Sequence, residues 1–160
     1  MRKIFWLIII LNFILLIPRF KAYMPALKSQ LAGDLRVVNS EEINELLNAF
    51  DWLKRQKDRG AIREDAVVVC RRPQMCYYYG RLRSYSFPFS KNKQLVFNSI
   101  IQADLIIVEN KRKMTQAFLN PVLLDSAKYF IPLYQVGDDP PLVILAVNKD
   151  EVAKLLQARP

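Results

Sequence analysis

Residues 71–89 form the stretch of this chain best suited to binding chemistry. Arginines and aromatic residues alternate closely along it, and the candidate binding residues are Arg71, Arg72, Tyr77, Tyr79, Arg81 and Arg83. A guanidinium group can hold a phosphate or a carboxylate through two parallel hydrogen bonds, and a tyrosine ring can stack on a sugar. The stretch predicts a site for an anionic glycan or a lipid phosphate. The alternative is that these side chains pack against the fold and serve only its structure.

Two pairs of adjacent carboxylates are candidates for acid–base catalysis. Asp138 and Asp139 precede two prolines, a pattern typical of a turn, and Glu64 and Asp65 precede a predicted strand. Neither pair has a neighbour in sequence that would separate two pKa values, as acid–base catalysis requires. We predict structural roles for both pairs and assign no catalytic residue.

The residue types that this sequence lacks exclude several classes of site. It contains no histidine, which excludes a Ser-His-Asp triad and a histidine zinc site, and its four glycines make no phosphate-binding loop. Cys70 and Cys76 are the only cysteines, too few for a four-ligand metal site. We therefore expect no metal and no cofactor. Cys70 ends an apolar run and is predicted to be a buried thiol, with a Cys70–Cys76 disulfide as the alternative outside the cytoplasm.

Apolar patterns predict alternating helices and strands that position this stretch. The apolar runs 66–70 and 104–108 show no alternation, which indicates central strands buried on both faces. A ligand site is expected beyond the carboxyl end of such a strand, where residue 71 begins the arginine-rich stretch. Two further strands are predicted as a hairpin of 130–136 with 142–147, and another strand at 83–87. Helices are predicted before Gly60, which ends the first one, directly after Pro73, at 93–101, within 111–129 and at 149–157. This alternation predicts an α/β fold, a three-layer sandwich with a mostly parallel sheet and a C-terminal hairpin.

Near the start of the chain, residues 4–17 contain one polar side chain, Asn12, and no charge. As a helix they would rise about 21 Å, short of the roughly 30 Å hydrocarbon core of a bilayer. We predict a transmembrane anchor over residues 1–22, with an uncleaved signal as the alternative, then a connector at 23–38 and an extracytoplasmic α/β domain at 39–160. Basic residues on the two sides of the segment are nearly balanced, so charge gives no orientation.

The net charge of +9 indicates an anionic neighbour. Because the basic residues are spread along the chain, we expect membrane lipid rather than nucleic acid to be that neighbour.

The order of motifs along the chain carries a family resemblance. The motifs are Tyr23–Leu27 (YMPAL), Phe50–Lys54 (FDWLK), the valine run that leads into RRPQMCYYYG, and Ala103–Val108 (ADLIIV). This order resembles the C-terminal extracytoplasmic domain of polytopic GT-C glycosyltransferases, the relatives of protein O-mannosyltransferases and of the lipid A aminoarabinose transferase. Arg71, Arg72 and Pro73 match the turn after the valine strand of that family, and Tyr77–Tyr79 match its aromatic cluster.

The resemblance implies a function without catalysis. In that family the catalytic acidic residues lie in loops between earlier transmembrane helices, which this sequence does not contain. It implies a non-catalytic, single-pass accessory or terminal domain at the cytoplasmic (inner) membrane, assisting sugar transfer from a polyprenyl phosphate. The implied partners are membrane lipid, a polytopic glycosyltransferase subunit, and polyprenyl phosphate or an anionic glycan. An independent anchored binding module is the alternative, and the chain could equally be the tail of a longer glycosyltransferase.

Overall fold

The structure of the protein is a computed structural model that describes residues 41–157. The predicted anchor over residues 1–22 and the connector at 23–38 lie outside this range. Between residues 41 and 157, no helix is both long enough and apolar enough to cross a membrane.

A five-stranded sheet forms the centre of the fold, with strand order β2-β1-β3-β5-β4. Its strands are β1 (Val67–Val69), β2 (Arg83–Tyr85), β3 (Leu105–Glu109), β4 (Phe130–Val136) and β5 (Leu142–Val147). Strand β1 pairs in parallel with β2 and β3, whereas β5 pairs antiparallel with β3 and β4. The α/β class and the C-terminal hairpin are confirmed, but the prediction of a mostly parallel sheet is wrong. The sheet is mixed because the hairpin places β5, and not another crossover strand, beside β3.

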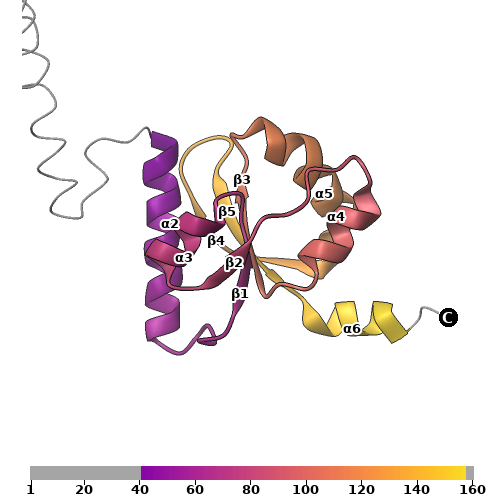
Figure 1. Ribbon diagram of the computed structural model, residues 1–160, viewed down its shortest axis with the longest axis horizontal. Coiled ribbons are helices and arrows are strands. Elements are labelled where there is room, and N and C mark those ends of the chain that lie inside the picture. Colours follow the sequence, from indigo (N-terminus) through magenta and orange to yellow (C-terminus); the bar gives the residue numbers. More distant parts are fainter. Residues whose placement is uncertain (1–40, 158–160) are drawn as a thin grey trace, which may run out of the picture. The chain divides into compact units, whose positions relative to one another are not determined.

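Helices cover both faces of the sheet (Figure 1). Helices α2 (Glu41–Asp58) and α3 (Pro73–Gly80) lie on one face, and α4 (Lys93–Ile100) and α5 (Asn120–Asp125) on the other. The remaining elements are the π-helix η2 (Thr115–Leu119), the short helix η3 (Ala127–Tyr129) and the C-terminal helix α6 (Lys149–Gln157). Helix α2 packs on the sheet through an apolar stripe, since Leu46, Leu47, Phe50 and Leu53 are buried.

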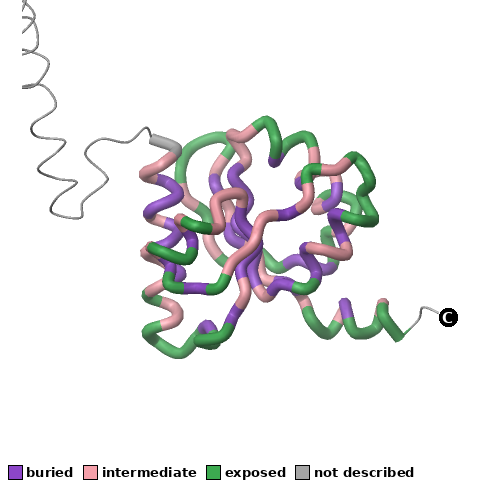
Figure 2. Tube along the Cα trace, in the orientation of Figure 1, coloured by how far each residue is buried: buried purple, intermediate pink, exposed green. Residues whose placement is uncertain are grey.

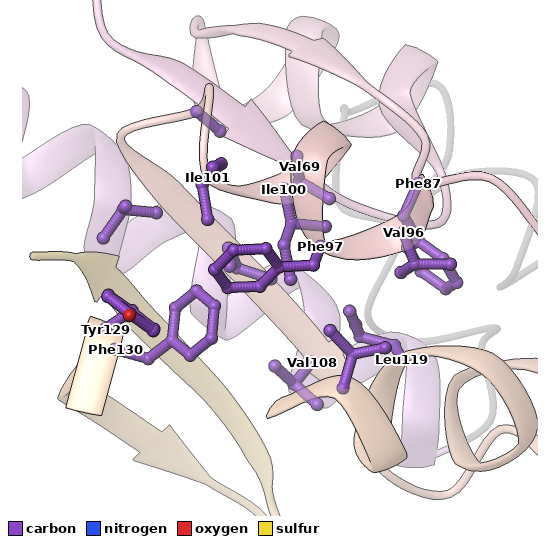
Figure 3. Close-up of a cluster of buried hydrophobic side chains, with 14 of the residues drawn as sticks. Val69, Phe87, Val96, Phe97, Ile100, Ile101, Val108, Leu119, Tyr129 and Phe130 are labelled. Carbon is purple, nitrogen blue, oxygen red and sulfur yellow. The ribbon is translucent and has the colours of Figure 1, made fainter. Parts of the chain in front are cut away.

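The strands predicted to be central are buried as expected (Figure 2). Every residue of β3 is buried, and Val68 and Val69 of β1 have no exposed surface. On the α4 side, Val69 and Ile106 pack against Phe97 and Ile100 of α4 in one apolar cluster (Figure 3). Phe97 also meets the ring of Tyr129 edge-on, with 5.4 Å between ring centroids. This packing fixes β1 and β3 side by side.

The crossovers create a point where the chain changes direction. From β1 the chain passes through α3 to β2 on one side, and from β2 it passes through α4 to β3 on the other side of β1. The loops after β1 and β3 therefore diverge at one edge of the sheet. In open α/β sheets such a switch point, beyond the carboxyl ends of the strands, is the usual ligand crevice.

The turn between β4 and β5 approaches α2 at Gly137. Its backbone has a φ of +88°, a region that side chains disfavour, and a Cβ atom there would overlap the carboxylate of Glu45. Gly60, in the turn just after α2, has a similar φ of +74° but has open space where its Cβ would lie.

These two glycines make a matched pair for a stability measurement. Gly60→Ala is expected to lower the free energy of unfolding by about 1 kcal/mol, because alanine is strained in a left-handed backbone. Gly137→Ala should cost about 2–4 kcal/mol, because displacement of Glu45 adds to the backbone strain. Urea unfolding at constant m-value measures both losses. Equal losses would show that the turn moves away from Glu45 without resistance.

Candidate functional site

The loops after β1 and β3 bring charged side chains to the switch point. Arg71 and Arg72 follow β1, and Glu109 ends β3 with Lys111 and Arg112 just beyond it. The two strands are neighbours in parallel register, with Val69 opposite Ile106. Hence the loops meet at the end of the sheet where the parallel strands β1 and β3 finish, called here the carboxyl edge. The start of α3 is also fixed there, because Ser84 Oγ of β2 donates a 2.7 Å hydrogen bond to the carbonyl of Pro73.

Glu109 lies at the centre of this group. Its side chain is only 7% exposed, and three guanidinium groups face it: Arg71 Nε at 3.5 Å, Arg72 Nε at 3.9 Å and Arg112 Nε at 3.8 Å. These separations are those of ion pairs and exceed the length of a good charge-assisted hydrogen bond. The arginine side chains keep between 23% and 31% of their surface exposed, so they are accessible from solvent while they surround a buried carboxylate.

A second ion pair ties helix α2 to the same edge. Lys111 Nζ donates to Glu45 Oε1 at 2.7 Å, and both side chains are mostly buried. The neighbouring Asn110 donates from Nδ2 to the carbonyl of Pro141 at 2.7 Å. The loop after β3 is thereby held between α2 and the β4–β5 turn.

Four cationic side chains gather in this cluster. Arg71, Arg72 and Arg112 face the buried Glu109, and Lys111 pairs with Glu45. Helix α3 begins next to Arg72 with Pro73 and has no acidic residue in its first turn. A helix N-terminus carries a partial positive charge, which adds to the same field.

Five buried side-chain polar atoms of the described residues have no hydrogen-bond partner. In the described part of the chain they are Asn44 Oδ1, Arg71 Nε, Glu109 Oε1, Thr115 Oγ1 and Asn120 Oδ1. Two of them belong to the central Arg71–Glu109 pair, and Asn44 precedes the Glu45 that binds Lys111. Asn120 donates from Nδ2 to Asn110 Oδ1 at 3.1 Å. Arg71 Nε and Glu109 Oε1 lie 3.5 Å apart as an ion pair without making a hydrogen bond.

The cavity at this edge is too small to enclose a ligand. It measures about 10 Å³, the room of one water molecule, and is lined by Glu45, Glu109, Asn110, Lys111, Arg112 and Leu142. Any larger ligand must therefore rest on the rim, against the exposed parts of the arginines.

The structure brings together only part of the site that the sequence predicts. Arg71 and Arg72 lie at the carboxyl edge, whereas Arg83 pairs with Val67 at the start of β1, on the opposite edge. Arg81 follows the far end of α3, about 12 Å along the helix from Pro73. The backbone carbonyl of Arg81 accepts a 2.9 Å hydrogen bond from Lys57 Nζ.

The predicted tyrosines lie on α3 and differ in environment. Tyr79 is half-buried and stacks on Phe50 of α2, with 6.4 Å between ring centroids, so packing explains it. Tyr77 is 67% exposed. The packing alternative thus holds for Tyr79, while Tyr77 stays open to solvent.

Glu45, Glu109, Lys111 and Arg112 were missed by the sequence analysis. The signal was present, since the polar run ENKRK directly follows the predicted strand 104–108. The rule that places a site beyond a buried parallel strand applies to both central strands, and only the first was considered. Glu45 gives no such signal because it lies within an ordinary amphipathic helix.

Both cysteines are free thiols with no exposed surface, which confirms the buried thiol predicted at position 70. A hydrogen bond between the two thiols raises the pKa of Cys70, and burial raises it further. The same contact lowers the pKa of Cys76, against the effect of burial. The carboxylates of Glu64, Asp65, Asp138 and Asp139 are exposed. Over residues 41–157, no group of three or more acidic and cysteine side chains is arranged to hold a metal ion.

Comparison with known proteins gives no relative: no family model, no curated protein and no solved structure matches the chain. The resemblance to GT-C glycosyltransferases therefore stays a prediction, and the geometry of the site must carry the functional argument.

Glu109→Gln tests whether the central carboxylate holds the arginines. Removing its charge leaves three guanidinium groups around a neutral amide, and we expect a loss of about 3 kcal/mol in unfolding free energy. Asp125→Asn is the control, because its 2.6 Å pair with Lys93 is more than half exposed and should be worth less than about 1 kcal/mol. Chemical unfolding compares the two. Similar small losses would mean that solvent already screens Glu109.

Proposed function

We propose that this domain is a binding module for a phosphate or carboxylate group, held on the rim formed by Arg71, Arg72, Lys111 and Arg112. The observation that carries the proposal is the convergence of these four cations at one end of the sheet, three of them around the buried Glu109 and Lys111 on the buried Glu45. Guanidinium groups bind phosphate monoesters and carboxylates through paired hydrogen bonds. The N-terminus of α3 supports the same ligand chemistry.

In this proposal Glu109 has a positioning role. Each arginine approaches it through Nε, so the planes of the guanidinium groups are set before a ligand arrives. Such preorganisation reduces the entropy lost on binding. The competing carboxylate also limits affinity, so the site suits reversible binding.

The shallow form of the site bears on the size of its ligand. A cavity of about 10 Å³ cannot enclose a small molecule, so the anionic group would be the end or a branch of something larger. The phosphate of a polyprenyl phosphate and an acid group of a glycan both meet this condition.

Arg72→Gln tests the binding site. A charge-assisted hydrogen bond is worth about 1.5–3 kcal/mol, so affinity for phosphate should fall by about tenfold or more. Titration calorimetry of the full chain with inorganic phosphate, a short-chain polyprenyl phosphate and an acidic oligosaccharide distinguishes a free anion from lipid and glycan sources. Arg83→Gln, on the opposite edge, is the matched control and should bind like the wild type. Equal binding by Arg72→Gln, or equal loss in Arg83→Gln, would contradict the proposal.

The wider proposal places this binding activity in a membrane-anchored, non-catalytic accessory domain related to the polyprenyl-phosphate-sugar glycosyltransferases, outside the cytoplasm at the inner membrane. It is supported by the order of motifs in the sequence and by the apolar segment 4–17. A polytopic glycosyltransferase should co-purify with the protein when it is extracted from its own membranes in mild detergent. If none does, the independent binding module is the better reading.

A further inference from the structure

An exposed aromatic ring lies one helical turn beyond Met75, the residue that the Arg72 side chain contacts. Tyr78 on α3 is 75% exposed, more than its neighbour Tyr77. Although exposed, its ring has a defined neighbour: it meets Tyr79 edge-on, with 5.0 Å between centroids and 78° between planes. Tyr79 in turn stacks on Phe50, which is fully buried. The ring of Tyr78 is thus supported from the core while its outer surface stays open.

Helix geometry places this ring on the side of α3 that Arg72 contacts. Arg72 Nη1 donates to Met75 Sδ at 3.8 Å, so the Arg72 side chain lies along the first turn of α3. Met75 and Tyr78 are three residues apart and share a face of the helix, about 4.5 Å apart along its axis. Helical side chains lean toward the N-terminus of their helix, which brings the Tyr78 ring over the turn that Arg72 contacts.

We propose that Tyr78 is a stacking platform for a sugar ring whose phosphate or carboxylate is held by the arginines. The ligand class is then a sugar that bears its acid group on or next to the ring, because ring and anion must fit within about one helical turn. A tyrosine face offers an apolar surface to the C–H side of a pyranose and a hydroxyl at its rim. This inference rests on the proposed function, since it extends the same site.

A comparison of two ligands of equal charge isolates the contribution of stacking. Glucose 1-phosphate has a ring and glycerol 3-phosphate has none, so the full chain should bind the first roughly two- to tenfold more tightly. Tyr78→Ala should abolish this ratio and leave the affinity for glycerol 3-phosphate unchanged. Tyr78→Phe should keep it, because the ring face and not the hydroxyl makes the contact.

Tyr77→Ala is the matched control. Tyr77 is adjacent and similarly exposed at 67%, but it lies on the helix face of Pro73 and Gln74, away from Met75. It should retain the wild-type ratio, and thermal unfolding should show that all variants fold alike. A ratio near one in the wild type, or a ratio unchanged in Tyr78→Ala, would overturn the platform while leaving the anion site intact. Failure of both phosphates to bind would overturn the anion site, and the platform with it.

Discussion

Strands β1 and β3 are buried on both faces, and the rest of the structure follows from that constraint. An apolar strand with no solvated side needs a helix on each face, so the crossovers through α3 and α4 must pass on opposite faces of the sheet. Crossovers between parallel strands are right-handed, so helices reach both faces only if one crossover leads from β1 to β2 and the next leads back past β1 to β3. The divergence of the following loops is a by-product of burying two strands. The proposed anion site therefore lies at an end of the sheet that the packing of the core has already opened.

Charge at that edge is arranged around a group that would be costly alone. A buried carboxylate is tolerated only with partners, and Glu109 has three arginines within 3.9 Å. The arginines also depend on the carboxylate, because their positive charges would repel one another without a negative charge between them. The carboxylate and the guanidinium groups thus stabilise one another in the folded protein. Lys111 and Glu45 extend this balance to helix α2.

The sequence was most informative where burial decides the structure. The runs 66–70 and 104–108, the stripe of α2 and the hairpin flanking GDDPP each lie where their pattern indicates, because each depends on neighbours close in sequence. It was least informative about side chains joined by the sheet. Arg72 and Arg83 are eleven residues apart yet lie on opposite edges, while Arg72 and Arg112 face one carboxylate from distant segments. The mixed sheet was missed for a related reason, since nothing in the hairpin sequence says which of its strands joins β3.

Gly137 and Glu45 restrict each other across ninety-two positions of sequence. The glycine is held by two independent demands, its positive φ and the carboxylate that fills the space of a Cβ atom. In diverged copies of this domain, the first demand would still admit asparagine, which tolerates a left-handed backbone. The filled space, in contrast, leaves no room for any side chain at position 137 while an acidic side chain occupies position 45. The two positions should therefore covary during evolution, with glycine giving way at 137 only after the helix has lost its glutamate.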